Sequence, residues 1–249
     1  MISYLDVIMD IGEQMLISGA EVHRVEDSVM RMCTSLGAVR TDVFIITSNM
    51  IVTVTDTEGN LHTQTKRITA SGTNIDRIHK LNALSRRICN EHPTKEVIRE
   101  EFSRIVNEKT YPFWLEIVAC CFIAGSFTLF FGGGIIEALI SFLIGGAVKL
   151  VLLGMDRVGI NKIFEKFVCT FIASAAATLF FKLGIVPGID KVMIGNIMSL
   201  IPGIGLTNAI RDLFIGDSIA GTLRTIEALL AALAIAAGYF LFVSIGGVI

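Results

Sequence analysis

Apolar and polar residues change their spacing twice in the first 110 residues. Apolar residues recur with a helical period from Leu5 to Leu36, which predicts two helices. Between them, Ser18-Gly-Ala-Glu21 has the pattern of a capping box, in which the serine and the glutamate satisfy each other's backbone amides. We therefore expect the first helix to end near Ile17 and the second to start just after Ser18.

The period then becomes two and later returns to that of a helix. Residues 43–46, 51–55 and 61–68 are rich in β-branched residues and alternate, which predicts three strands. Helical spacing resumes at 75–88, behind a Thr73-Asn-Ile-Asp76 cap, and again at 97–106. Helices, a short antiparallel sheet and further helices predict a small α+β domain over residues 1–110.

Long apolar runs fill the rest of the chain, residues 111–249. Each is long enough to cross about 30 Å of hydrocarbon as a helix. The fold class is therefore an α-helical integral membrane protein of about five transmembrane helices with an N-terminal α+β domain. We expect the spans at residues 113–131, 135–153, 167–186, 192–215 and 222–248.

Lysine and arginine set the expected orientation. They are denser in the loops on the side of the α+β domain, as with Arg157, Lys162 and Lys166, and near Lys109. The positive-inside rule makes that side cytoplasmic, so we expect a multi-pass protein of the plasma (inner) membrane with its C-terminus outside. Polar residues near the start, such as Asp6 and Asp10, argue against a cleavable signal peptide.

Composition excludes several function classes. Of 249 residues, 53% are hydrophobic and 18% are charged, and the net charge is −2 with no basic stripe, so we expect no nucleic-acid partner. The five cysteines and four histidines show no metal-ligand spacing, which predicts neither a metal site nor a cofactor. Without a nucleophile–base motif or a phosphate-binding loop, the chain is not expected to be an enzyme.

The fourth apolar run is broken by Pro202 and Gly203 and carries polar residues. A proline frees a backbone carbonyl, and at membrane depth such a group is tolerated where protein or a water-filled cavity satisfies it. A broken span with intramembrane polar groups predicts a substrate path. The expected path residues are Asn196, Ser199, Pro202, Gly203, Thr207, Asn208, Arg211, Asp212, Asp217, Arg224 and Glu227.

Three of the intramembrane polar residues have a simpler interpretation. Asp212 is the best proton carrier if burial raises its pKa, but it could instead form a structural ion pair with Arg211. Glu137 and Arg211 lie near span ends and could be interfacial caps.

A cytoplasmic polar cluster stands at the expected start of the second helix. It could be a polar site with His23 as proton carrier. Alternatively, it is a solvated face on which Glu21 pairs with Arg24 and His23 pairs with Asp27. Its members are Glu21, His23, Arg24, Glu26 and Asp27.

Two motifs resemble the threonine/serine exporter family, ThrE, in its YjjP-like branch. They are Ser18-Gly-Ala-Glu-Val-His-Arg-Val-Glu-Asp27 and the segment from Leu200-Ile-Pro-Gly203 through Thr207-Asn-Ala-Ile-Arg-Asp212 to Gly221-Thr-Leu-Arg224. The resemblance implies export of a small-molecule substrate, either threonine and serine or a dicarboxylate such as succinate, driven by the proton-motive force.

The same resemblance implies how the chain is assembled. Longer family members carry a second, YjjB-like membrane half in the same chain, so a separate YjjB-like membrane subunit or a homo-oligomer is expected within the membrane lipid. Small-residue faces in the spans agree with close helix packing between subunits. The alternatives are a membrane-anchored enzyme and a regulatory subunit, each acting through the N-terminal domain.

Overall fold

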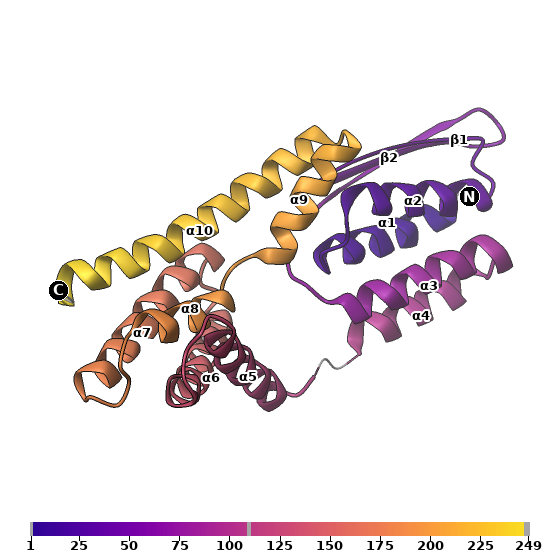
Figure 1. The fold of residues 1–249 in the computed structure, drawn as a ribbon. Helices are drawn as coiled ribbons and strands as arrows, with labels where there is room; N and C mark the ends of the chain where they lie inside the picture. The colour runs from indigo at the N-terminus through magenta and orange to yellow at the C-terminus, as the bar shows by residue number, and fades with distance from the viewer. Residues whose placement is uncertain (1, 109–110, 247–249) are drawn as a thin grey trace. The chain divides into compact units, whose positions relative to one another are not determined.

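The structure is a computed structural model that describes residues 2–108 and 111–246 (Figure 1). The chain divides into two compact units. The first comprises Met1–Lys109 and Ile204–Thr225, and the second comprises Thr110–Gly203 and Ile226–Ile249. The last two residues of the predicted fifth span and the predicted domain boundary after residue 110 touch residues outside the described part of the chain.

The first unit contains the predicted α+β elements and, in addition, a helix from the far end of the sequence. Its last helix, α10, runs on into the second unit. The elements are α1 (Ile2–Ile17), α2 (Val22–Ser35), β1 (Arg40–Ile46), β2 (Asn49–Thr55), β3 (Leu61–Arg67), α3 (Ile75–Glu91), α4 (Lys95–Asn107), α9 (Gly203–Ile215) and the start of α10 (Ser218–Gly246).

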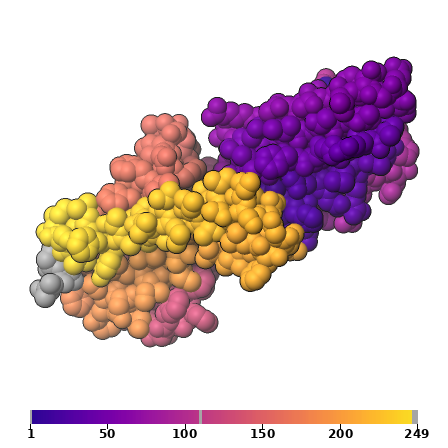
Figure 2. Space-filling model, turned by 90° about the horizontal axis from the view of Figure 1, so that it is seen from above, coloured from indigo at the N-terminus to yellow at the C-terminus, as the bar shows by residue number. Residues whose placement is uncertain are grey.

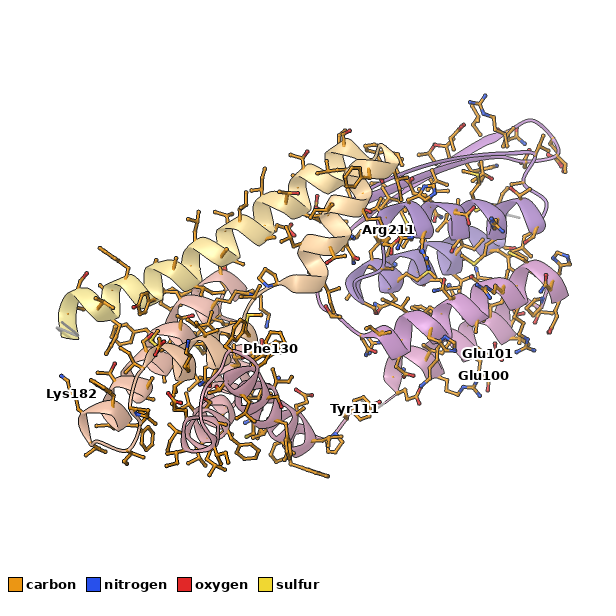
Figure 3. The ribbon with its side chains drawn as sticks, in the orientation of Figure 1. Glu100, Glu101, Tyr111, Phe130, Lys182 and Arg211 are labelled. Atoms are coloured by element: carbon orange, nitrogen blue, oxygen red, sulfur yellow. The ribbon has the colours of Figure 1, made fainter. Side chains whose placement is uncertain are left out.

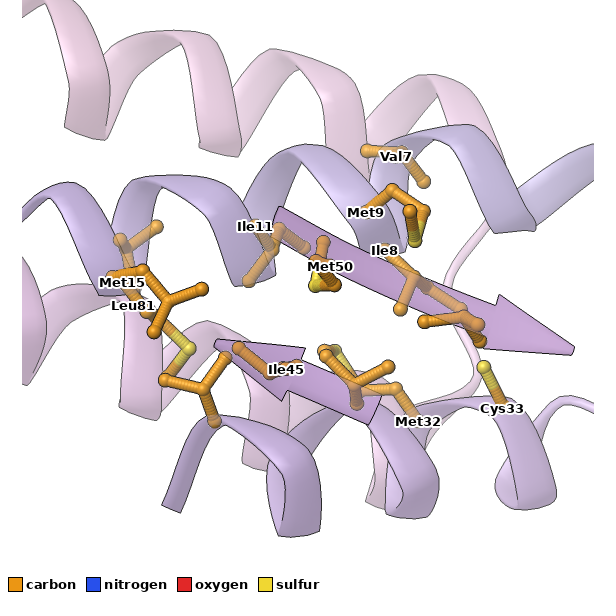
Figure 4. Close-up of a cluster of buried hydrophobic side chains, with 14 of the residues drawn as sticks. Val7, Ile8, Met9, Ile11, Met15, Met32, Cys33, Ile45, Met50 and Leu81 are labelled. Atoms are coloured by element: carbon orange, nitrogen blue, oxygen red, sulfur yellow. The ribbon is translucent and has the colours of Figure 1, made fainter. Parts of the chain in front are cut away.

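The three strands form an antiparallel sheet in the order β1-β2-β3, as the period-two pattern predicted. Met50, Val52 and Val54 alternate along β2 and are fully buried. They join a core built with α1, α2 and α3, in which Ile8, Ile11 and Leu81 are also buried (Figure 4). One face of the sheet is thus packed on helices, which explains why buried and half-buried residues alternate along β2.

The connection between α1 and α2 differs from the predicted capping box. Gly19 has a φ of +92°, and its amide and that of Ala20 bond back to the carbonyls of Leu16 and Met15. This is the Schellman pattern, so a left-handed glycine ends α1. Helix α2 begins only at Val22, and its N-cap Glu21 makes no side-chain capping bond.

The ends of α3 agree with the sequence prediction better than the connection between α1 and α2 does. The side chain of Asn74 accepts a hydrogen bond from the amide of Arg77 at the start of α3, within the predicted cap. Helix α3 ends at His92, which takes a left-handed conformation before Pro93. The predicted pair of helices after the sheet is therefore confirmed.

The second unit consists of helices. They are α5 (Phe113–Phe130), α6 (Ile135–Val158), α7 (Lys162–Lys182), α8 (Asp190–Met198) and the remainder of α10. Within the described part of the chain, four helices, α5, α6, α7 and α10, are long and apolar enough to cross a membrane, and α8 with α9 would count as a fifth, broken span. Arg157, Lys162 and Lys166, which were expected in a loop, lie on helices, because α6 runs on to Val158 and α7 already begins at Lys162.

Helices α5, α6 and α8 pack closely within this unit. The hydroxyl of Thr128 on α5 donates to Ser141 on α6 at 2.6 Å, and both side chains are buried. A Cβ on Gly195 of α8 would overlap Thr128, so the glycine permits this contact. Glu137 accepts a bond from the amide of Gly134 at 2.5 Å, which makes it a cap at the start of α6.

The expected fourth span is two helices that belong to different units. Helix α8 ends at Met198 in the second unit, and α9 begins at Gly203, from where the chain continues in the first unit. Pro202 lies between them, where the sequence predicted the break. Residues on the two sides of the break therefore have separate surroundings.

Candidate functional site

Helix α9 and the start of α10 form a hairpin whose turn follows from the sequence. Gly216 has a φ of +98°, and the amides of Gly216 and Asp217 bond to the carbonyls of Leu213 and Asp212. This Schellman turn ends α9. On α10, Gly221 faces Leu213, and a Cβ there would lie 2.8 Å from the Leu213 nitrogen. The two helices can therefore pack in close contact.

Three polar side chains of this hairpin bind three consecutive residues of the α1–α2 loop. Asn208 donates to the carbonyl of Gly19 at 3.4 Å, and Arg224 donates to the carbonyl of Ala20 at 2.8 Å. Arg211 donates to the carboxylate of Glu21 at 2.8 Å. We call this set the clamp: Asn208, Arg211 and Arg224 on Gly19, Ala20 and Glu21. Arg211 is labelled on α9 in Figure 3.

The clamp has an exposed side and a buried side. On the exposed side, Glu21 also lies 3.3 Å from Arg24, and the side chains of Arg24 and Arg211 are 62% and 50% exposed. On the buried side, Arg224 lies 3.1 Å from Asp212, which is fully buried. Asp212 thus pairs with Arg224, and the alternative pairing of Asp212 with Arg211 is wrong.

The carboxyl group of Asp212 lies in a fully buried site. Its side chain has 0% exposure, and apart from the ion pair with Arg224 its two carboxyl oxygens make no hydrogen bond within the described part of the chain. Burying an ion pair costs desolvation energy that the Coulomb attraction must offset, and an unpaired buried charge costs more. Arg224 therefore provides a positive charge that offsets the burial of the Asp212 carboxyl group.

The remaining residues of the cytoplasmic polar cluster have other partners. Glu26 accepts a hydrogen bond from the amide of Ile45 at 2.9 Å and so satisfies a donor of the edge strand β1. Asp27 pairs with Arg31 along the helix surface, and His23 is exposed. The predicted surface pair of Glu21 with Arg24 forms, but Asp27 does not pair with His23 as the alternative expected.

The pKa of the Glu26 carboxyl is shifted upward in the folded protein. Burial raises the pKa of its carboxyl above the ordinary value, the bond from the Ile45 amide lowers it, and the charge of Asp217 raises it again. Folding therefore favours the protonated form of Glu26.

In the second unit, the end of α8 is held by a lysine that the sequence pattern marks only as one of the basic residues that set the orientation. Lys166 on α7 donates from Nζ to the carbonyl of Leu200 at 2.6 Å. The α8 carbonyls just before Pro202 cannot continue a helix, so this lysine satisfies one of them. No local pattern could have revealed this pairing, because 34 residues separate the two partners.

Asn196 is the most buried polar residue of α8. Its amide nitrogen donates to the carbonyl of Val192 at 2.8 Å, while its side-chain oxygen makes no hydrogen bond to the described residues. Ser199 donates to the carbonyl of Asn196 at 2.8 Å. Asn196 thus offers a free acceptor in the interior of the second unit.

The structure divides the predicted substrate path between the two units. Asn196, Ser199, Pro202, Gly203 and Glu227 belong to the second unit. Thr207, Asn208, Arg211, Asp212, Asp217 and Arg224 belong to the first, where four of them make or support the clamp. That these residues line one path stays a prediction.

A groove of about 780 Å³ lies between α3 and α4 in the first unit. Its charged lining is largely paired internally: Lys80 bonds Glu108 at 2.7 Å, and Arg87 pairs with Glu101. The predicted site residues lie elsewhere. Paired rims of this kind are ordinary on helical surfaces, so the groove adds little to the functional argument.

The comparisons with known proteins identify the family. Among the described residues, no cluster of three or more histidine, cysteine or acidic residues could hold a metal ion. No curated protein and no solved structure matched the chain. A family model described as "Putative threonine/serine exporter" matches residues 6–246, nearly the whole chain. The chain therefore belongs to the threonine/serine exporter family.

Proposed function

We propose that this chain is a subunit of a secondary exporter of threonine, serine or a related small carboxylate, driven by the proton-motive force, with its first unit in the cytoplasm. Membership of an exporter family and the apolar helices support transport across a membrane. The observation that carries the mechanism is the clamp, because both sequence motifs of the family resemblance meet there.

The exposed side of the clamp has the chemistry of a carboxylate site. Two arginines, Arg211 and Arg24, flank the carboxylate of Glu21, and both are at least half exposed. A guanidinium binds any carboxylate in the same geometry. The carboxylate of an amino acid or of a dicarboxylate therefore competes with Glu21 for Arg211, and substrate arrival would loosen the clamp.

The buried side of the clamp supplies a proton carrier for this proposal. Asp212 is buried, and its charge depends on Arg224. Loosening the α1–α2 loop frees Arg224 from the carbonyl of Ala20 and changes the surroundings of Asp212. Substrate binding and proton binding would then be linked through one ion pair.

The end of α8 supports a path through the second unit. Broken apolar helices in transporters place freed backbone groups next to the transported molecule. Here Lys166 holds the Leu200 carbonyl, and Asn196 offers a buried acceptor one turn earlier. A substrate with both an ammonium group and a carboxylate would find an acceptor on Asn196 of α8 and a cation on Lys166 of the neighbouring α7.

Efflux from reconstituted vesicles tests the function. Vesicles preloaded with labelled threonine, serine or succinate are given an imposed proton gradient. The initial rate at which they lose the label is compared with that of preloaded vesicles without protein. Gradient-dependent loss of at least one of the three is expected, and loss that ignores the gradient would refute the coupling. Labelling of a cysteine placed at Glu58, in the β2–β3 turn, from outside intact cells would refute the cytoplasmic location.

We also propose that the exporter contains more than one membrane subunit, either a second copy or a YjjB-like chain. Exposed apolar side chains along α10, such as Leu229, Leu233 and Phe240, give it a surface for lipid or another subunit. The mass of the complex extracted in native lipid discs tests this proposal. Full efflux from discs or vesicles shown to hold single copies would contradict it.

A further inference from the structure

Helices α7 and α8 of the second unit hold buried acceptors that lack a donor. Within the described part of this unit, three buried side-chain oxygens make no hydrogen bond, and all three lie on these two helices. They are Oε1 of Glu165, Oγ1 of Thr178 and Oδ1 of Asn196. Their residues are only 1–4% exposed. Because most buried polar atoms are hydrogen-bonded, such a group of acceptors points to a bound molecule that brings donors.

Glu165 is the charged member of the three, and it lies inside the helix bundle. It shares the buried side of α7 with Cys169 and Ala173, which follow at intervals of four residues and belong to the apolar core of the unit. Helix α10 covers α7 closely, since a Cβ on Gly238 would overlap the carbonyl of Phe167. Figure 2 shows the yellow part of α10 lying across the salmon and orange helices. An acidic residue inside an apolar bundle is typical of a substrate or ion path.

The ion pair of Glu165 satisfies only half of its carboxylate. Oε2 lies 3.3 Å from Nζ of Lys162, a side chain that is 64% exposed and also contacts Asp156. Oε1 keeps no donor of its own. An ammonium group carries three N–H donors and a positive charge, and it can therefore satisfy both oxygens of one carboxylate.

The residue after Glu165 brings the opposite charge to the end of α8. Nζ of Lys166 donates to the carbonyl of Leu200, about one turn beyond Asn196. Thr178 lies more than three turns further along α7 and is not part of this group. The end of α8 is thus accompanied by one carboxylate, one ammonium group and one free amide oxygen, which together carry no net charge.

This charge balance matches a zwitterion. The ammonium group of an amino acid would meet the carboxylate of Glu165 and the amide oxygen of Asn196, and its carboxylate would meet Lys166. A dicarboxylate has two negative charges and no ammonium donor, so its second carboxylate would meet Glu165 and be repelled. Selection by a repulsive charge is an ordinary source of specificity.

We propose that Glu165 is a specificity-determining residue, whose carboxylate binds the ammonium group of the substrate and rejects dicarboxylates. The inference rests on the proposed export of small carboxylates and decides between the candidate substrates. It also gives the unpartnered oxygen of Glu165 a donor.

Ligand-induced stabilisation tests the role of Glu165. Thermal unfolding of the full-length chain in native lipid discs is followed with increasing L-threonine, N-acetylthreonine or succinate. N-acetylthreonine keeps the carboxylate and the hydroxyl but lacks the charged ammonium group. The variants are Glu165→Gln, which removes the charge, and Glu165→Asp, which keeps it. Asp190→Asn is the matched control, because Asp190 stands in the first turn of α8 and is 65% exposed.

Threonine should stabilise the wild type and Asp190→Asn, whereas N-acetylthreonine and succinate should not. In Glu165→Gln, half-maximal stabilisation should need roughly 10- to 100-fold more threonine, because a charge-assisted hydrogen bond is lost. Glu165→Asp should still prefer threonine to N-acetylthreonine. An unchanged threonine requirement in Glu165→Gln overturns the proposal. Equal stabilisation of the wild type by threonine and N-acetylthreonine, or none by threonine, also overturns it.

The binding measurement needs no proton gradient, so it separates this proposal from the proposed function. A wild type that is stabilised by threonine alone supports the role of Glu165, even if its vesicles show no gradient-dependent efflux. That combination would refute proton-driven export and leave the ammonium site in place.

Discussion

The guanidinium of Arg211 donates a hydrogen bond to the carboxylate of Glu21 across 2.8 Å, although 190 residues separate the two in the sequence. Arg224 repeats the connection one residue earlier in the loop, at Ala20. The α1–α2 loop is thereby tied to the hairpin that leads into α10. If that hairpin moves, these hydrogen bonds must break or the α1–α2 loop must move with it. We therefore propose that export is coupled to proton binding at this contact.

The buried ion pair predicts a large loss of stability when one partner is removed. Arg224→Gln leaves Asp212 buried and unpaired, which should cost about 3–5 kcal/mol. Thermal unfolding in detergent measures it. Arg31→Gln, which breaks the exposed pair with Asp27, should leave the melting temperature nearly unchanged. Adding Asp212→Asn to Arg224→Gln should recover part of the loss, and no recovery would contradict the ion-pair account.

Replacing the titrating group separates a proton carrier from a structural residue. Asp212→Asn keeps the shape of the side chain but cannot exchange a proton. If Asp212 is the proton carrier, the Asp212→Asn variant should lose proton-driven export and retain counterflow exchange. If both activities survive, or both fail together, Asp212 has only a structural role.

The lysine that holds the end of α8 should matter for export. Lys166→Met leaves the carbonyl of Leu200 without its donor, a loss of about 1–3 kcal/mol for a buried acceptor. We expect export to fall while membrane abundance stays within about twofold of wild type. Lys182→Met is the matched control, because Lys182 is exposed at the other end of α7. Equal export by the two variants would remove Lys166 from the path.

Two glycines with nearly the same backbone conformation test the shape of the α1–α2 loop. Gly19 and Gly37 have φ of +92° and +96°, so alanine at either should cost about 1–2 kcal/mol. Only at Gly19 would the new Cβ meet another group, the carbonyl of Gly72 at 2.9 Å, whereas the space at Gly37 is open. Gly19→Ala should therefore lower the melting temperature further and also reduce export. Equal effects of both changes would show that the loop tolerates displacement.

The raised pKa of Glu26 predicts that the stability of the protein depends on pH. Its pKa is raised in the folded protein, so folding favours the protonated form, and this stability is fully present below the ordinary glutamate pKa. It is lost as the pH rises through the raised value. Glu26→Gln should therefore melt higher than wild type at pH 7 and show a smaller difference near pH 4. Glu100→Gln, an exposed change on α4 (Figure 3), should show no such trend.

Local patterns predicted much of the fold. The three strands, the cap at Asn74 and the break at Pro202 follow from periods and turn residues that act within a few positions. The capping box failed because Gly19 offers α1 a left-handed end, which competes with an early start of α2. Both outcomes are encoded in the same four residues, and the backbone conformation of one glycine decides between them.

The candidate site was only half visible in the sequence. Arg211, Arg224 and Asp212 stood out because charges are costly in an apolar run. Their partners did not, since backbone carbonyls of Gly19 and Ala20 carry no sequence signal. Lys166 was read as a marker of orientation for the same reason: its partner is a main-chain oxygen.

A double-mutant cycle on Glu21 and Arg211 tests the coupling role of the clamp most directly. The initial rate of proton-driven threonine efflux is measured for wild type, Glu21→Gln, Arg211→Gln and the double variant, at matched protein content in the vesicles. If export runs through this bond, each single change lowers the rate by roughly 5- to 150-fold, and the double variant is no slower than the slower single one. Wild-type rates in both single variants, or a double variant whose loss is the product of the two single losses, would contradict the account.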